Sequence, residues 1–191
     1  MSAPSSPVID PLKDLRAVAG SRQENAARQQ FCGDIDMRIG RDGTWFYHGS
    51  PIGRKPLVKL FASVLRREDD GRYWLVTPAE RGRIKVDDVP FTAVEVNASN
   101  RGAAQLLTFR TNLDDTVVAD SEHPIRVIHD SVTGEPRPYI LVRDRLEARI
   151  LRPVFYELVE LAEVRLVGGE EVHGVWSRER FFPLGRGESA A

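Results

Sequence analysis

The stretch Tyr73-Trp74-Leu75-Val76, followed by Arg83-Ile84, is the most informative part of the sequence, because the same pattern returns later in the chain. The second copy is Tyr139-Ile140-Leu141-Val142, followed at the same spacing by Arg149-Ile150. Both four-residue runs are apolar and rich in aromatic and β-branched residues, which are typical of β-strands. We therefore predict a strand at each run and infer that one module occurs twice.

A turn rich in aspartate precedes each of these strands and supports the duplication. Asp42-Gly43-Thr44-Trp45-Phe46 leads after a few residues to Pro51-Ile52. Asp114-Asp115-Thr116-Val117-Val118 leads, one residue longer, to Pro124-Ile125. Each match alone is weak, because apolar strands and Asp-turns recur by chance. The two matches keep their order along the chain, which favours an internal repeat over coincidence.

Helical periodicity marks the main difference between the copies. Apolar residues recur at spacings of three and four from about Pro51 to Arg66, which predicts a helix. The second copy has a shorter turn there, with Gly134-Glu135-Pro136. We predict two further helices, over Asp10–Ala19 and over Pro153–Leu161. The core candidates of the last helix are Phe155, Leu158, Val159 and Leu161.

These elements predict an α+β fold of two similar, mostly antiparallel β-rich modules, each with a packed helix. Residues 1–20 are expected to form an N-terminal tail and short helix, and residues 21–97 the first module. Residues 98–184 form the predicted second module, and residues 185–191 a disordered tail rich in small residues. The polar, glycine-bearing stretch from Asn97 to Ala103 is the predicted joint.

Composition excludes several classes of function. The 191 residues carry 27 Lys and Arg against 28 Asp and Glu, a net charge of −1, without the basic excess of a general nucleic-acid binder. Cys32 is the only cysteine, so an intrachain disulfide and a zinc site of several thiolates are both excluded. Because no secretory signal or apolar membrane span is found, we expect a cytoplasmic protein with no membrane or nucleic-acid partner.

No catalytic motif is recognisable in the chain. The four histidines do not stand at metal-ligand spacing, and no nucleophile elbow or calcium loop is present. We predict no metal, no cofactor and no catalytic residue. Besides two non-enzymatic functions considered below, an enzyme of unrecognised type is a third alternative. In that case His48 is the first candidate for a catalytic residue, because it ends the strand that leads into Gly49.

The stretch from Gly49 to Pro56 follows a predicted strand and opens a predicted helix, where a phosphate loop would lie. The phosphate-loop pattern fails, because Pro56 stands where a Ser or Thr should hold magnesium. One interpretation is that Ser50 caps the helix and Pro51 lies in its first turn. The other is an anion site with Arg54 and Lys55 as side-chain clamps.

Basic residues next to aromatic ones extend the second interpretation. Arg83 follows the Tyr73 strand, and Arg143 follows its counterpart at Tyr139. Arginine can pair with a phosphate and stack on a ring, although most charges at strand ends are simply solvated. If a pocket lies between the two copies, its predicted ligand-binding residues are Arg54, Lys55, Arg83, Tyr139 and Arg143.

The chain resembles a bacterial family known as domain of unknown function 1285, and the likeness spans nearly the whole chain between its ends. The segments that carry the likeness are Gly33–Ile39, Asp42–Tyr47, Ser50–Ile52, Leu60–Arg67, Val76–Glu80, Thr108–Asn112, Val154–Val159 and Gly174–Ser177. The resemblance implies a two-domain α+β fold with internal duplication and a second domain similar to pleckstrin-homology-like folds. It also implies a nucleotide-type ligand at the domain interface and a role in signal transduction, with no agreed functional residues.

Two non-enzymatic functions follow as hypotheses. The first is a sensor that binds a small anionic, nucleotide-like ligand between its two modules. The alternative is a protein-interaction module without a small ligand, because pleckstrin-like folds often bind partners through a sheet edge or groove. A polar cleft between the copies would favour the first function, and a contiguous exposed apolar patch would favour the second.

Overall fold

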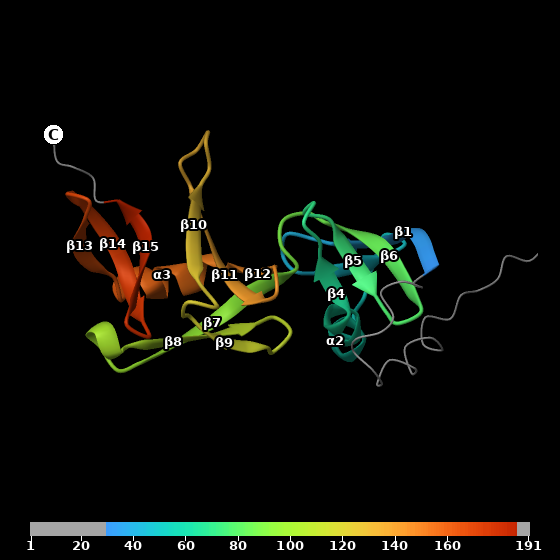
Figure 1. Cartoon of the computed structure of the whole chain (residues 1–191), viewed down its shortest axis with the longest axis horizontal. Coiled ribbons are helices and arrows are strands. Elements are labelled where there is room, and N and C mark those ends of the chain that lie inside the picture. Colours follow the sequence, from blue (N-terminus) through green and yellow to red (C-terminus); the bar gives the residue numbers. More distant parts are fainter. Residues whose placement is uncertain (1–29, 187–191) are drawn as a thin grey trace, which may run out of the picture.

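A computed structural model describes residues 30–186, and the helix predicted over Asp10–Ala19 lies outside them. The molecule is elongated (Figure 1). A first six-stranded sheet lies at one end, a second six-stranded sheet lies in the middle, and a three-stranded sheet lies at the other end (Figure 1). Two α-helices occur among the described residues, so the α+β class is confirmed, with strands prevailing.

The first sheet has the strand order β3-β2-β1-β6-β5-β4. Its middle pair, β1 and β6, is parallel, and the other pairs are antiparallel. Met37, Ile39 and Trp45 point to the buried side. The strand bounds are Gln30–Ile39 for β1, Trp45–Tyr47 for β2, Ser50–Pro51 for β3, Leu65–Arg67 for β4, Tyr73–Val76 for β5 and Glu80–Val86 for β6.

The helix predicted from about Pro51 is shorter in the structure and begins later. Ser50 and Pro51 form β3, which pairs with β2 through a two-residue turn at His48 and Gly49. Both turn residues have positive φ, 47° and 75°, which is the backbone of a tight hairpin. The helix α2 therefore spans Lys55–Ser63, with Arg54 at its N-cap, so Ser50 is not its cap.

The second sheet has the order β10-β11-β12-β7-β8-β9, again with one parallel pair, β7 and β12, in its middle. A short 3-10 helix over Gly102–Ala104 joins β7 to β8. The strand bounds are Phe91–Ser99 for β7, Leu106–Thr111 for β8, Thr116–Val118 for β9, Ile125–His129 for β10, Pro136–Arg143 for β11 and Leu146–Ile150 for β12. The predicted joint at 97–103 thus contains the end of β7 and the 3-10 helix.

The duplication is present in the strand topology. Reading the second sheet from β9 gives β9-β8-β7-β12-β11-β10, the same order as β3-β2-β1-β6-β5-β4. The repeated Tyr73 and Tyr139 runs lie in β5 and β11, which are equivalent. The matched Asp-turns lead instead into β2 and β9, which are not equivalent, so that alignment is wrong by one strand. Short Asp-turns recur at hairpins generally and do not identify which hairpin they close.

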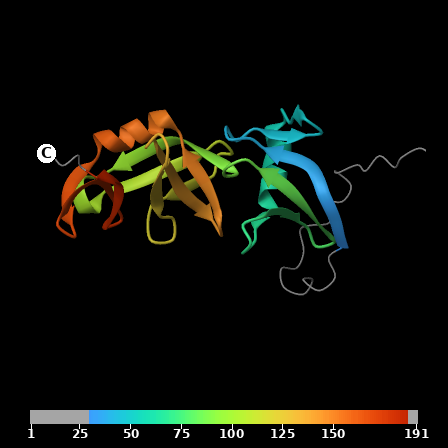
Figure 2. The same ribbon diagram turned by 90° about the horizontal axis from the view of Figure 1, so that it is seen from above.

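The two helices occupy different places in the repeat. Helix α2 lies between β3 and β4, whereas α3, Arg152–Glu160, follows β12 and lies across one face of the second sheet (Figure 2). Val154 and Leu158 of α3 are buried, and Phe155 and Leu161 are partly buried against the core. The prediction that Val159 is a core residue is wrong, because 49% of its surface is exposed.

A third sheet follows α3, with the order β13-β14-β15. Its strands are Glu163–Val167, Glu170–Ser177 and Arg180–Arg186. The sequence indicated only the middle strand, as 173–176. It missed β13 because every residue of that strand is exposed, so burial leaves no alternating pattern to detect. The tail predicted from residue 185 begins inside β15, and residues 187–191 are outside the described range.

One continuous core joins both modules. Buried side chains from Met37 and Trp45 in the first sheet, through Phe91 and Phe109 in the second, to Leu184 in the third sheet belong to a single cluster. The chain passes from the first sheet to the second between Val86 and Phe91. Because Phe91 is fully buried immediately after this connection, the second sheet is anchored where the first one ends.

Candidate functional site

Ion pairs and a capped helix end hold the two modules together. Asp114, in the turn between β8 and β9, accepts hydrogen bonds from Lys55 Nζ and Lys59 Nζ of α2, each at 2.8 Å. These two donors lower the pKa of Asp114 to about 2. Arg143 binds Asp115 at 3.1 Å and donates to the Ala62 carbonyl at the end of α2 at 2.8 Å. One part of the junction is therefore a contact between α2 and the β8–β9 turn.

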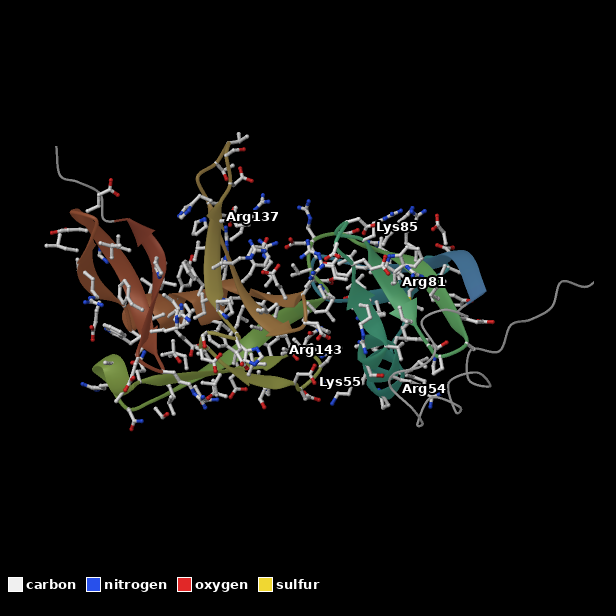
Figure 3. All side chains as sticks on the ribbon, viewed as in Figure 1. Arg54, Lys55, Arg81, Lys85, Arg137 and Arg143 are labelled. Carbon is white, nitrogen blue, oxygen red and sulfur yellow. The ribbon has the colours of Figure 1, made fainter. Side chains whose placement is uncertain are left out.

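The five predicted ligand-binding residues do not converge on one site. Lys55 and Arg143 lie close together between the modules, each already bound to an acid of the β8–β9 turn (Figure 3). Arg54 lies farther out, at the start of α2 (Figure 3). Arg83 makes a bidentate pair with Asp34 on the first sheet, at 2.6 and 2.7 Å. Tyr139 lies elsewhere on the second sheet, hydrogen-bonded to Asp88.

An open pocket of about 510 Å³ lies where the β1–β2 turn meets the second sheet and α3. Arg41 is the residue that the first module contributes. The second module supplies the remaining walls. The lining residues are Arg41, Glu135, Pro136, Pro138, Arg149, Ile150, Leu151, Arg152, Pro153, Phe155 and Tyr156. The pocket thus combines arginines with prolines and aromatic rings.

Positive charge exceeds negative charge in this pocket. Arg152 pairs with Glu135, the one carboxylate of the lining. Arg149 Nη1 lies 3.5 Å from Asp88 Oδ2, at the outer limit of a hydrogen bond. Arg41 has no ion-pair partner among residues 30–186 and is exposed. An anion entering the pocket would therefore meet guanidinium donors that the protein itself does not fully use.

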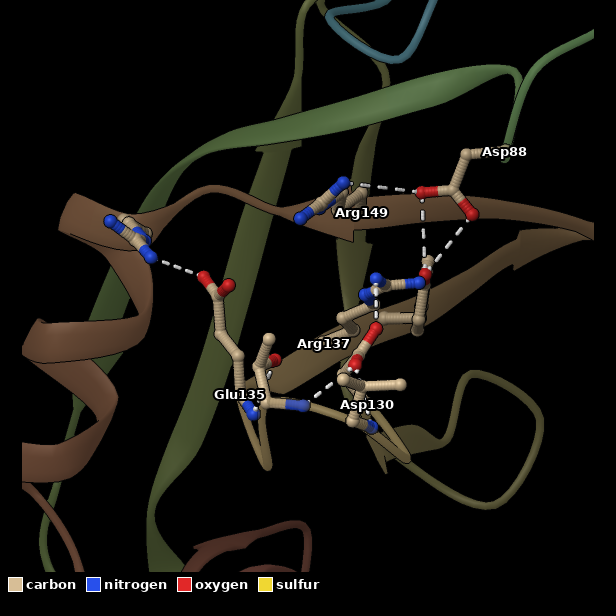
Figure 4. Close-up of polar contacts among 9 residues, drawn as sticks. Asp88, Asp130, Glu135, Arg137 and Arg149 are labelled. Atoms are coloured by element: carbon tan, nitrogen blue, oxygen red, sulfur yellow. Dashed lines mark hydrogen bonds and ion pairs between the residues drawn. The ribbon is translucent and has the colours of Figure 1, made fainter.

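Asp88 links the pocket to the buried part of the second sheet (Figure 4). The Tyr139 hydroxyl donates to Asp88 Oδ1 at 3.0 Å. Burial, together with the nearby Asp88 charge, raises the pKa of Tyr139, so this hydroxyl stays protonated and remains a donor. Arg149 is consequently placed by an acid that a buried tyrosine holds in position.

The rim of the pocket is formed by the β10–β11 hairpin, which Asp130 closes. Its carboxylate accepts the backbone N–H groups of Val132 and Thr133, each at 3.0 Å, and pairs with Arg137 (Figure 4). The backbone N–H donors, led by that of Thr133, lower the pKa of Asp130. Pro136 and Pro138 on β11 then stiffen the strand that faces the pocket, because proline fixes φ.

Sequence reasoning missed the three arginines of the pocket. Arg149 was noticed only as the counterpart of Arg83 in the repeat, and neither Arg41 nor Arg152 was among the predicted ligand-binding residues. The signal in the sequence that could have indicated them is that each is a basic residue at or near the end of a strand or helix. The sequence did not show that a turn of the first module lies beside α3 of the second.

Other chemistries find little support among residues 30–186. No group of three or more His, Cys, Asp or Glu side chains within that range is placed to hold a metal ion. His48 pairs with Asp36 at 3.0 Å on an exposed hairpin and does not line the pocket. None of the helices described by the structure is long and apolar enough to span a membrane.

Comparison with known proteins supports a single family assignment. A family model described as the N-terminal domain of DUF1285, a domain of unknown function, matches residues 27–89, and the C-terminal domain model matches residues 90–184. This chain belongs to the DUF1285 family. The two DUF1285 models meet at the connection between β6 and β7, and the predicted boundary at residues 97 and 98 lies farther along the chain, inside β7.

Two solved DUF1285 structures resemble the chain. A DUF1285 family protein from Silicibacter pomeroyi DSS-3 is 46% identical, with a TM-score of 0.79, and the match covers 93% of this chain and 95% of that one. A DUF1285 family protein from Shewanella baltica OS155 is 24% identical, with a TM-score of 0.52, over 66% of this chain and 91% of that one. The second likeness supports the fold alone. No curated protein matches the chain.

Proposed function

We propose that this chain is a non-catalytic binding protein for a small anionic, nucleotide-like ligand, held in the pocket of Arg41, Arg149 and Arg152. The observation that carries the proposal is the position of Arg41, which the first module presents to a pocket of about 510 Å³ in the second and which has no ion-pair partner among residues 30–186. That volume is within the range of small-molecule sites. The anionic part of the ligand would bind the arginines, because guanidinium groups match phosphate and carboxylate oxygens in bidentate pairs.

The other wall of the pocket suits a flat organic group. Pro153, Phe155 and Tyr156 of α3 line it, and 62% of the Tyr156 surface is exposed and free to cover a ring. An aromatic ring can stack on a base, and arginine contributes to such stacking. A ligand with an anionic group joined to a planar ring, as in a nucleotide, combines both chemistries.

A sensor role follows from the position of Arg41. A ligand that bridges Arg41 of the first module and Arg149 of the second binds more tightly when the modules are in one arrangement, and so shifts the population toward it. This is the physical basis on which we propose a part in signal transduction, inside the cytoplasm. Among the predicted residues, Tyr139 contributes by holding Asp88, whereas Lys55 and Arg143 serve the junction.

A thermal-shift screen of nucleotides, phosphorylated metabolites and inorganic phosphate tests the proposal. A compound that binds the folded state raises the melting temperature by mass action. Arg41→Ala should leave the melting temperature of the free protein unchanged and weaken binding of a confirmed compound by about 10-fold or more. Arg54→Ala is the matched control, because Arg54 is also exposed, lies outside the pocket and has no ion-pair partner among residues 30–186.

The control also separates the two versions of the site. If Arg54→Ala weakens binding and Arg41→Ala does not, the ligand binds at the start of α2, as the sequence had predicted. If no compound raises the melting temperature, the ligand-binding proposal fails.

The alternative function, a protein-interaction module, rests on a separate observation. Val164, Leu166 and Val167 of β13 are exposed at the end of the molecule away from the pocket. The family resemblance implies that the second module has a pleckstrin-homology-like architecture, which would suit this role. The six-stranded sheet followed directly by α3 supports that architecture. Substituting Leu166 by Asp should abolish partner binding in this case and leave the binding of small anions unchanged.

A further inference from the structure

Strand β13 is a free sheet edge at the far end of the molecule (Figure 1). It pairs with β14 on one side, and no strand among residues 30–186 pairs with its other side. All five of its residues are exposed, including Val164 at 53%, Leu166 at 74% and Val167 at 50%. Such an edge presents a row of unpaired backbone N–H and C=O groups to another strand.

Proteins usually protect a free edge with charged side chains that extend into solvent. The two charged residues of β13 are held against the sheet instead. Glu163 Oε2 accepts the indole N–H of Trp176 at 2.9 Å, and the guanidinium of Arg165 lies 4.8 Å from the centroid of the Trp176 ring. Both side chains therefore lie on one face of the sheet in fixed positions, and the backbone edge beside them stays accessible.

The sequence of β13 is self-complementary in one antiparallel register. Two antiparallel strands pair residues whose side chains lie on the same face, so a two-fold axis between identical strands lies midway between a residue and its own copy. An axis at Arg165 would place Arg165 opposite its own copy, which is repulsive. An axis at Val164 places Glu163 opposite Arg165 of the second copy, and Arg165 opposite its Glu163. That register forms two opposite-charge pairs.

We propose that two copies of this chain associate through antiparallel pairing of β13 with β13, with Val164 opposite its own copy across the two-fold axis. The product is one continuous sheet, in which the third sheet of each copy supplies half of the strands. Val164 packs against its own copy, and Leu166 covers Ala162 of the other copy. A strand of five residues covers less surface than a standard protein interface. The dimer should therefore be weak, and it should dissociate within the range of protein concentrations that can be measured.

Sedimentation equilibrium of the full chain, from about 1 µM to about 1 mM, tests the proposal. The native chain should show a monomer–dimer equilibrium. Glu163→Arg and Arg165→Glu should each weaken the dimer by about 10-fold, because symmetry converts both charge pairs to repulsion. The double variant E163R/R165E should recover the dimer. Glu80→Arg makes the same change of charge at an exposed position of the first sheet and should have no effect.

Symmetric cross-linking tests the register. In a chain whose only cysteine, Cys32, is replaced by Ser, Val164→Cys should oxidise to a covalent dimer, because paired residues bring their Cα atoms within disulfide range. Leu166→Cys should not, because the two copies of residue 166 lie four residues apart along the strands, about 13 Å. Cross-linking through 166 and not 164 would overturn the Val164 register.

Two further results would overturn the proposal as a whole. The first is a chain that remains monomeric up to about 1 mM. The second is a dimer that E163R leaves unaffected, which would show that another surface forms it. Melting temperatures of all variants, each expected within a few degrees of the native chain, check that the substitutions act on association and not on folding.

Discussion

Gly43 shows how one turn residue fixes the contact between the modules. Its φ is +80°, in the left-handed region, and a Cβ at this position would lie 2.6 Å from Asn112 Nδ2. Asn112 donates to the Gly43 carbonyl at 3.3 Å and accepts the Thr92 backbone N–H at 3.1 Å. The close approach of the β1–β2 turn to the second sheet thus depends on a residue without a side chain.

Replacing Gly43 by Ala should lower the free energy of unfolding by about 2–4 kcal/mol, because the left-handed backbone and the contact with Asn112 both become unfavourable. Gly49→Ala is the matched control. Gly49 also has positive φ, 75°, but a Cβ there meets nothing within 4 Å, so only the backbone cost of about 1–2 kcal/mol applies. Urea denaturation measures both losses, and equal values would contradict the role given to Asn112.

Helix α2 meets the β8–β9 turn through one carboxylate and two lysines. Asp114 itself has φ of 64°, a conformation that aspartate and asparagine tolerate better than most residues. Lys55 and Lys59 stand one helical turn apart and reach the two oxygens of Asp114 from the same face of α2. The helix is thereby aligned with the second module.

This contact should make stability depend on pH at the acid end. The pKa of Asp114 is about 2 in the folded state against an ordinary value of 3.8, so its stabilising effect is fully present above about pH 4 and is lost as pH falls to about 2. We expect Asp114→Asn, which keeps the turn geometry, to be less stable than the native chain at pH 7. The free energies of unfolding of the native chain and of Asp114→Asn, measured as a function of pH, should converge near pH 2. A gap that stays constant between pH 7 and pH 2 would refute this linkage.

At the level of the whole chain, duplication has produced two sheets of one topology that share one core. Arg143 contributes to this continuity, because it bonds to the end of α2 and lies 5.1 Å from the ring centroid of buried Phe91. We therefore expect the two modules to unfold together in a single cooperative transition.

The transition can be followed with two probes. In Trp176→Phe the remaining tryptophans, Trp45 and Trp74, both lie in the first sheet, so fluorescence reports the first module. Far-ultraviolet circular dichroism reports all strands and helices. The two midpoints should coincide in urea, and a first-module transition that precedes the loss of circular dichroism would show that the modules unfold separately.

Much of the fold could be predicted from local patterns. The apolar runs at Tyr73 and Tyr139 identified equivalent strands, and the periodicity around Leu158 identified α3. The errors occurred where local signals are ambiguous. Ser50-Pro51 has the composition of a helix start, yet the positive φ of His48 and Gly49 turns it back along β2 as a strand. The order of residues does not show whether Ser50-Pro51 starts a helix or forms a strand, because either structure is compatible with the backbone of these two residues.

The candidate site was the least predictable part. Basic residues beside an aromatic one were expected, but the residues named were Arg54, Lys55, Arg83, Tyr139 and Arg143. The structure pairs Lys55, Arg83 and Arg143 with nearby carboxylates. Arg41 and Arg54 have no ion-pair partner within the described range, and of these two only Arg41 lines the pocket. Ion pairing between elements decides which cations are available, and it depends on distances that residue order does not encode.

The order of residues was enough to predict the repeated strand pattern, the α+β class and the family, because hydrophobic spacing and turn residues act over a few neighbours. The tertiary structure alone decided the alignment of the repeats, the three-stranded sheet with its free β13 edge, and the meeting of Arg41 with Arg149 and Arg152. These features arise from contacts between residues far apart in the chain. Only the packing of the shared core brings them together.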